Sequence, residues 1–318
     1  MEEAGAVKIY KLLAVMLAVT ALAAGCGQEE RSGRETQTEE TGGAGSSEQA
    51  GQTEPAEEAA DMTDGETVTN ALLPEELAQI PRGYFEESDS QGTLVELTYD
   101  IYESMSYEEQ DQVLKKRAIV YLPYGYSEDE QYNVFYLMHG GWSNETTYLG
   151  TPERPNEFKN VLDNGIADGK IRPMIVVCPT YNNESESDSS SYSLALRLTE
   201  NYHNELLGDL IPAVEGTYST YAEDATAEGI RASRDHRAFC GFSMGSVATW
   251  RTFQYCLDDF RYFLPSSGSL TADVEDGTFR YANNEKEGNL YFLEQEGGTH
   301  NGDYAMEYFY NGLCWIWQ

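Results

Sequence analysis

Residues 237–250 read Arg237-Ala-Phe-Cys-Gly-Phe-Ser-Met-Gly-Ser-Val-Ala-Thr-Trp250 and place one serine between two glycines. An apolar run precedes this Gly-x-Ser-x-Gly pattern, and a run with helical spacing follows it. A tight turn of the same composition also arises by chance, because glycine is a common residue. Between a strand and a helix, however, the pattern predicts a nucleophile elbow that exposes the Ser243 hydroxyl above the end of a sheet. The flanking sequence therefore decides between the two interpretations.

The flanking sequence supplies this context, because strand-like and helical runs alternate along it. Asn133–Met138 and Pro173–Cys178 are continuous apolar runs, as expected of parallel strands covered on both faces. Leu194–Val214 carries leucine and tyrosine at four-residue intervals, which predicts a long helix. Further strands are expected at 93–101, 117–122, 237–240, 262–264 and 290–293, and further helices at 156–166, 244–257 and 304–315. The alternation predicts an α/β fold with a doubly wound, mostly parallel sheet and helices on both faces.

A base for the Ser243 hydroxyl is expected among the four histidines, because a serine is a poor nucleophile until a base accepts its proton. His203 falls inside the long helix and His236 precedes the nucleophile strand, so both are interpreted as structural or solvated. His300 directly follows the last expected strand. A histidine at that place, downstream of the serine, matches the order of catalytic residues in α/β-hydrolases. The sequence thus predicts Ser243 as nucleophile and His300 as base.

The loop after residues 133–138 is expected to complete the site. The backbone N–H groups of Met244, next to the serine, and of Gly141 are predicted to bind the oxyanion of the reaction. His139 precedes the glycine pair and is expected to shape this loop and to contact substrate. Trp142 is expected either to stack on an aromatic acyl group or a sugar, or only to cap the loop. No Cys-x-x-Cys pattern or His/Cys cluster suggests a metal site.

Several motifs in order resemble the putative esterase family, which holds feruloyl and acetyl-xylan esterases. They are Tyr121-Leu-Pro-Tyr-Gly-Tyr126, Tyr136-Leu-Met-His-Gly-Gly141, Ser233-Arg-Asp-His-Arg237, Gly241-Phe-Ser-Met-Gly245 and Gly297-Gly-Thr-His300. The similarity extends from about Leu94 to the C-terminus. The resemblance implies an α/β-hydrolase that cleaves ester-linked acyl groups through an acyl-serine intermediate, without metal or organic cofactor. The implied substrate is an acylated plant polysaccharide such as xylan.

The acid of the expected triad is less clear than its serine and histidine. The family carries the acid after a strand between those expected at 262–264 and 290–293, but only residues 265–289 separate the two here. This interval accommodates one crossover and not two, so the acid-bearing strand is expected to be missing. Three alternatives remain: Asp273 or Asp276 reaches His300 from a loop, another carboxylate such as Asp303 substitutes, or the triad has no acid.

The N-terminus predicts export. Residues 1–26 combine two lysines, a short apolar stretch and the sequence Leu22-Ala-Ala-Gly-Cys26, which resembles a bacterial lipobox. Cys26 is the expected lipidation site, and it predicts a protein anchored on the extracellular face of the cell membrane. Residues 27–72 are rich in Glu, Gly, Ser and Thr and are expected to form a disordered tether. Residues 73–318 form the predicted esterase domain.

Composition limits the partners. The chain has 318 residues and a formal net charge of -35, which argues against nucleic-acid binding, because nucleic-acid binders present basic faces. The four cysteines after Cys26 allow two disulfide bridges or buried free thiols. The leading hypothesis is a lipid-anchored feruloyl or acetyl-xylan esterase. The alternatives are an impaired esterase fold that binds carbohydrate and an acyltransferase.

Overall fold

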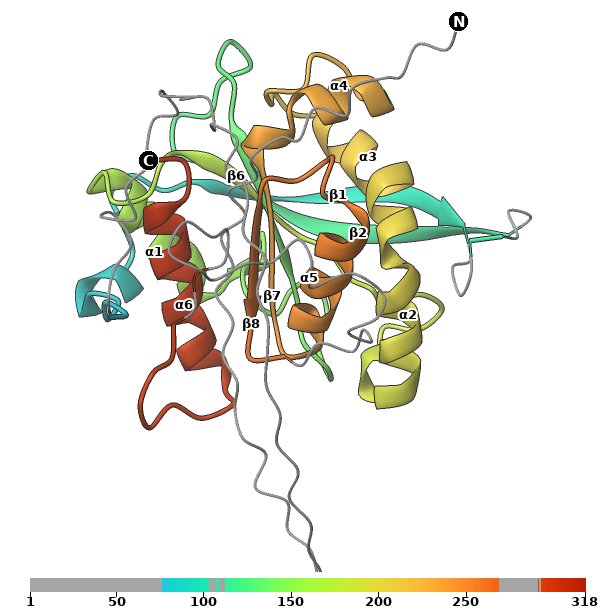
Figure 1. Ribbon diagram of the computed structural model, residues 1–318. Helices are drawn as coiled ribbons and strands as arrows, with labels where there is room; N and C mark the ends of the chain where they lie inside the picture. The colour runs from blue at the N-terminus through green and yellow to red at the C-terminus, as the bar shows by residue number, and fades with distance from the viewer. Residues whose placement is uncertain (1–75, 103–106, 109–111, 269–290, 292) are drawn as a thin grey trace, which may run out of the picture. The chain divides into compact units, whose positions relative to one another are not determined.

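The computed structural model describes residues 76–102, 107–108, 112–268, 291 and 293–318. In this part of the chain, six strands form a sheet in the spatial order β1-β2-β6-β3-β7-β8 (Figure 1). Their bounds are β1 Thr93–Tyr102, β2 Val113–Leu122, β6 Met174–Cys178, β3 Asn133–Met138, β7 Arg237–Phe242 and β8 Tyr262–Ser266. Strands β6, β3, β7 and β8 are parallel, whereas β1 and β2 pair antiparallel with each other and β2 pairs antiparallel with β6. The expected α/β architecture is confirmed.

Strand β3 explains why the centre of the sheet is apolar on both faces. All of its residues are buried. Val134, Tyr136 and Met138 enter the core on one face, and Phe135 and Leu137 enter the core on the other. Successive side chains of a strand point to opposite faces, so a strand covered on both sides reads as a continuous apolar run. The edge strand β1 instead alternates between buried and more exposed residues at most of its positions.

Helices cover both faces of the sheet (Figure 1). On one face lie α2 (Tyr192–Glu205), α3 (Ile211–Glu215) and α5 (Met244–Tyr255), and on the other lie α1 (Glu157–Ala167) and α6 (Gly302–Trp315). The helix expected over 194–214 is one helical run, but its middle, Leu206–Leu210, is a π turn that joins α2 to α3. Shorter elements are the 3₁₀ turns Arg82–Phe85, Asp188–Ser190 and Arg234–His236, the helix α4 (Ala227–Ala232), and the hairpin β4 (Gly150–Thr151) and β5 (Arg154–Pro155).

Arg237 fixes the beginning of β7, the strand that leads to the serine. Its side chain is 1% exposed and forms two hydrogen bonds with the Glu215 carboxylate, at 2.6 and 2.8 Å. The same guanidinium donates to the backbone carbonyls of Ile230 and Asp259 and to the Ser233 hydroxyl. A planar guanidinium suits such a site, because its five donors diverge in fixed directions. One side chain therefore joins β7 to α3, to α4 and to the turn before β8.

The prediction of a strand over 290–293 is wrong for Tyr291 and Leu293, the two residues of this range that the structure describes. Tyr291 and Leu293 lie in irregular backbone, and Leu293 is buried in the same core as α6. A short apolar run that packs in the core as irregular backbone has the same composition as a strand. The sequence alone therefore did not distinguish irregular backbone from a strand here. Pro265 and Ser266 extend β8 beyond its expected end. The rest of the interval in which an acid-bearing strand is expected to be missing, from residue 269 onward, lies outside the described residues.

The cysteine alternatives are resolved for the described domain. Cys178, Cys240, Cys256 and Cys314 are free thiols, and the first three are buried. Burial raises the pKa of the Cys240 and Cys256 thiols well above its ordinary value, which keeps both thiols protonated. The signal segment, Cys26 and the expected tether lie outside the described residues. Within the described ranges, no helix is long and apolar enough to cross a membrane.

Candidate active site

Ser243 occupies the turn between β7 and α5 with φ 58° and ψ -118°. A non-glycine residue rarely adopts a positive φ, and such strain concentrates at functional sites. The two flanking glycines make the turn possible. A Cβ on Gly241 would lie 2.4 Å from the Gly245 carbonyl oxygen, and a Cβ on Gly245 would lie 2.3 Å from the Met138 carbonyl oxygen. Each glycine of the Gly-x-Ser-x-Gly pattern is therefore required by backbone packing, as in a nucleophile elbow.

His300 brings its imidazole to the serine from the loop before α6. Its Nε2 lies 2.9 Å from the Ser243 Oγ. The next residue, Asn301, caps α6 by accepting a hydrogen bond from the Tyr304 N–H at 3.1 Å, so the helix fixes the end of the loop. The Phe242 ring packs against the imidazole with centroids 4.5 Å apart. A hydroxyl and an imidazole at this distance are a nucleophile and a base within hydrogen-bond reach.

Among the described residues, no carboxylate contacts the second nitrogen of His300. Its Nδ1 lies 2.9 Å from the Ser267 Oγ. Asp273 and Asp276 lie outside the described residues, and Asp303 stands in the first turn of α6 without a hydrogen bond or ion pair to His300. Burial lowers the pKa of His300 below its ordinary value, so the imidazole is neutral and can accept a proton at neutral pH. No sequence pattern marked Ser267 for this position.

The two expected oxyanion donors line the cleft together with Ser243. Among the described residues, neither the Met244 N–H nor the Gly141 N–H donates a hydrogen bond to another group. Met244 is the first residue of α5, where backbone N–H groups have no partner in the helix and the helix dipole is positive. Both amides are thus available to a substrate oxygen that gains negative charge beside Ser243.

Two buried side chains orient the Gly141 amide. The carbonyl oxygen of Gly140 accepts a hydrogen bond from the Tyr181 hydroxyl at 2.8 Å and one from the His139 Nδ1 at 2.7 Å. Because the carbonyl oxygen can only accept, His139 Nδ1 carries the proton, and the Thr180 hydroxyl donates to Nε2 at 2.6 Å. In a planar trans peptide the C=O and N–H point in opposite directions. Holding the Gly140 carbonyl therefore also fixes the direction of the Gly141 N–H.

His139 was expected to contact substrate, and this expectation is wrong. The side chain is 1% exposed, stacks on Tyr181 with ring centroids 4.5 Å apart and does not line the cleft. Burial lowers its pKa to about 4, so it is neutral at pH 7. Its expected role in shaping the loop agrees with the structure. The sequence could not show that the strand end carrying His139 is covered by the loop that follows β6.

The cleft above Ser243 has a volume of about 320 Å³. Two aromatic side chains line it, Trp142 and Tyr192, which are 75% and 59% exposed. The Trp142 N–H donates to the Ser189 carbonyl at 3.0 Å, which ties the loop to the turn that precedes α2. The other lining residues are Gly141, Ser189, Ser243, Met244, Val247, Ser267, Gly268 and His300. Tyr192 was not singled out in the sequence, because its acidic, serine-rich neighbourhood reads as a solvated loop.

The other two histidines lie away from the serine in structural contacts. His236 stacks on Tyr221 and its Nδ1 lies 2.7 Å from the Asn133 Oδ1, while His203 stacks on Tyr255. Among the described residues, no group of three or more His, Cys, Asp or Glu side chains is arranged to hold a metal ion.

The chain is similar in sequence to known xylan-degrading enzymes. It is 34% identical over 245 residues, 62% of this chain, to "Endo-1,4-beta-xylanase Y" of Acetivibrio thermocellus. It is 35% identical over 139 residues, 42% of this chain, to "Endo-1,4-beta-xylanase/feruloyl esterase" of Xylanibacter ruminicola. The chain covers only 21% and 16% of the lengths of these two relatives. The similarity thus concerns one part of each larger protein.

Solved structures agree with this similarity. The feruloyl esterase module from Clostridium thermocellum, in complex with sinapinate, is 30% identical, with a TM-score of 0.62 over 76% of this chain and 93% of that one. A ferulic acid esterase from Anaeromyces mucronatus shares the fold at 19% identity, with a TM-score of 0.54 over 74% of this chain and 94% of that one. Residues 114–271 match the family described as Putative esterase. The chain therefore belongs to the putative esterase family of carboxylic ester hydrolases.

Proposed function

We propose that this protein is a serine esterase that removes feruloyl or acetyl groups from plant cell-wall polysaccharide such as xylan. The observation that carries the proposal is the contact of 2.9 Å between the His300 Nε2 and the Ser243 Oγ, beside two unpartnered amides of the described chain. A base within hydrogen-bond reach of a strained serine, next to oxyanion donors, is the arrangement that acyl transfer requires.

The reaction follows from these positions. Ser243 Oγ attacks the ester carbonyl while His300 Nε2 accepts the hydroxyl proton, and the Met244 and Gly141 N–H groups bind the oxyanion that forms. Collapse of this intermediate expels the sugar alcohol, which takes the proton from His300, and leaves an acyl group on Ser243. Water, deprotonated by the same imidazole, then attacks the acyl-serine and releases the acid. Each oxyanion donor is worth about 2.7–4 kcal/mol in enzymes where one has been removed.

The substrate class is supported by the relatives and by the cleft. Relatives are named as xylanases and feruloyl esterases, and one solved relative is complexed with sinapinate, a phenolic acid. In this chain, the exposed rings of Trp142 and Tyr192 line the cleft that contains Ser243. Aromatic pairs contribute about 0.5–1.5 kcal/mol beyond the burial of their surface. We therefore expect Trp142→Ala to lower kcat/KM for methyl ferulate about 3- to 10-fold more than for p-nitrophenyl acetate.

The test is ester hydrolysis by the full chain, measured with methyl ferulate and with acetylated xylan. Ser243→Ala is expected to abolish turnover. Ser246→Ala is the matched control, because Ser246 is three residues away, 0% exposed, and its Oγ has no hydrogen-bond partner among the described residues. The proposal fails if Ser243→Ala hydrolyses these esters as fast as the wild type.

Two alternatives have distinct outcomes in the same assay. An impaired esterase fold would bind xylo-oligosaccharides without turnover, and the assembled contact between Ser243 and His300 argues against it. An acyltransferase would pass the acyl group to a sugar hydroxyl, so product analysis in the presence of xylo-oligosaccharides would detect new esters in place of free ferulate.

We also propose that the protein is exported and held at the extracellular face of the cell membrane by a lipid on Cys26. The lipobox-like sequence that ends at Cys26 supports this proposal. Mass spectrometry of the mature N-terminal peptide tests it: a diacylglyceryl group on Cys26 is expected, and an unmodified Cys26 or a different N-terminus would refute it.

A further inference from the structure

We propose that the Ser267 hydroxyl, in place of a carboxylate, holds the His300 imidazole in the orientation that makes it a base. The inference rests on the proposed esterase function. The imidazole lies between two serines, with Nε2 at 2.9 Å from Ser243 Oγ and Nδ1 at 2.9 Å from Ser267 Oγ. Nε2 can accept the Ser243 proton only if Nδ1 carries the imidazole proton. An oxygen at Nδ1 that accepts this proton selects the required tautomer, and Ser267 supplies that oxygen.

The end of the sheet fixes Ser267 beside Ser243. Phe242 and Ser266 are register partners in the parallel pair β7–β8. Ser243 and Ser267, the next residue after each, therefore lie at the same carboxyl end of the sheet. The Ser243 N–H donates to the Ser266 carbonyl at 3.0 Å, which extends this pairing by one residue. Ser267 has φ 53°, close to the 58° of Ser243. A positive φ at a serine is uncommon and strained, and strain of this kind concentrates at functional sites.

No charged group performs this role among the described residues. His300 has no hydrogen bond or ion pair to a carboxylate there, and only burial shifts its pKa. Among the described residues, the titratable side chains on the surrounding elements include Glu294, Glu296, Asp303, Tyr304, Glu307 and Tyr308 in the His300 loop and α6, and Tyr192 across the cleft. An adjacent carboxylate would stabilise the imidazolium and raise the pKa of His300. A serine oxygen that accepts from Nδ1 adds no such charge, so His300 remains a base in more acidic solution.

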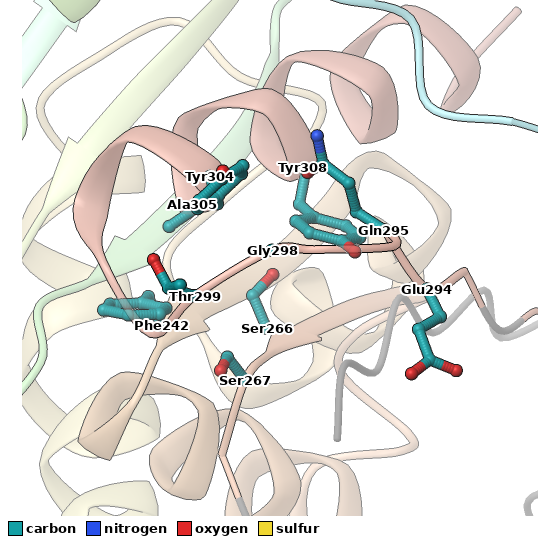
Figure 2. Close-up of a pocket in the computed structure, with 10 residues that line it drawn as sticks. All are labelled: Phe242, Ser266, Ser267, Glu294, Gln295, Gly298, Thr299, Tyr304, Ala305 and Tyr308. Carbon is teal, nitrogen blue, oxygen red and sulfur yellow. The ribbon is translucent and has the colours of Figure 1, made fainter. Parts of the chain in front are cut away.

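A second cavity, of about 60 Å³, is also lined by Ser267 (Figure 2). It is lined by Ser266 and Ser267 from the end of β8, by Gln295 from the loop before His300, and by Tyr308 from α6. Ser266 Oγ and Gln295 Oε1 have no hydrogen-bond partner among the described residues. A space of this size accommodates water, which can bond to these two polar atoms. Because Ser267 lines this cavity and its Oγ lies 2.9 Å from His300 Nδ1, we expect a small carboxylate to reach Nδ1 once the Ser267 side chain is removed.

The test uses Ser267→Gly and Ser267→Asp in the full chain. Glycine relieves the backbone strain at φ 53° and removes the whole hydroxymethyl side chain. Aspartate tolerates this conformation and restores an acceptor with a charge. Ser267→Gly is expected to lower kcat about 3- to 10-fold, the worth of one neutral hydrogen bond, and added formate is expected to restore it. Ser267→Asp is expected to retain activity but to move the acidic limb of kcat/KM upward by about one pH unit or more.

The opposite results overturn the inference. A Ser267→Gly variant with the kcat and pH profile of the wild type would show that the hydroxyl does not orient His300. A loss of about 10³- to 10⁴-fold in Asp273→Asn/Asp276→Asn would assign the role to a carboxylate instead. Ser246→Ala is the control for serine removal nearby.

A readout that does not need turnover separates this inference from the proposed function. The ¹⁵N shifts of His300, assigned with a His300→Gln variant, report its tautomer in the resting protein. The Nδ1–H form is expected in the wild type and a mixture of tautomers in Ser267→Gly. The same tautomer distribution in both proteins refutes the inference even if the protein hydrolyses no ester. Failure of the proposed function appears instead as unchanged hydrolysis in Ser243→Ala.

Discussion

Removal of the Tyr181 hydroxyl tests how the oxyanion site is held. In Tyr181→Phe the ring still stacks on His139, but the hydrogen bond of 2.8 Å to the Gly140 carbonyl is lost. The His139 donor to the same carbonyl, at 2.7 Å, remains. One neutral hydrogen bond is worth about 0.5–1.5 kcal/mol, and complete loss of an oxyanion donor costs about 2.7–4 kcal/mol. The expected decrease in kcat is therefore about 3- to 10-fold, well below the 10²- to 10³-fold that loss of a donor causes.

The assay is steady-state hydrolysis of p-nitrophenyl acetate. The loss should appear in kcat with little change in KM, because the Gly141 N–H acts mainly on charge that develops during the reaction. Tyr202→Phe is the matched control: it also removes a buried tyrosine hydroxyl, but one with no hydrogen-bond partner among the described residues. The reasoning is refuted if Tyr181→Phe keeps the kcat of the wild type, or if Tyr202→Phe loses as much.

Three further predictions concern the scaffold of the site. Arg237→Met should lower the free energy of unfolding, measured in urea, by about 3–5 kcal/mol, because it leaves the buried Glu215 carboxylate without its charged partner. The double variant Arg237→Met/Glu215→Leu should recover part of this loss. If the two substitutions instead destabilise the protein additively, the explanation is contradicted. Gly245→Ala should lower kcat on the order of 10²-fold, because its Cβ would lie 2.3 Å from the Met138 carbonyl oxygen and displace the elbow; wild-type kinetics would disprove this. Burial lowers the pKa of His139 from 6.5 to about 4, so below pH 6.5 the unfolded chain binds a proton that the folded chain does not. The free energy of unfolding should therefore fall by up to about 3 kcal/mol between pH 6.5 and 4. Urea titrations at several pH values should show a smaller decrease for His139→Gln.

The elbow and the central strands were predictable because their patterns are local. Gly241 and Gly245 flank Ser243 at a spacing that backbone packing requires, and β3 is apolar at every position because both of its faces are covered. The assignment of His300 as the base remains a prediction, but its position beside Ser243 in the structure agrees with it. In each of these cases one segment and its immediate neighbours carry the signal, which is why the residues alone indicated the element.

Only the tertiary structure decided the contacts between distant segments. Ser267 meets His300 across 33 positions of sequence, and Tyr181 meets the Gly140 carbonyl across 41. Serine and tyrosine are common residues without a pattern that marks these roles, and His139 ends a strand whether its ring faces the cleft or the core. Register partners in a parallel sheet are set by pairing and by packing of helices on both faces, which involve the whole domain. The sequence by itself therefore determined the fold class and indicated the nucleophile and its base. Only the assembled sheet, at the carboxyl ends of β7 and β8, could bring Ser267 to the other side of His300.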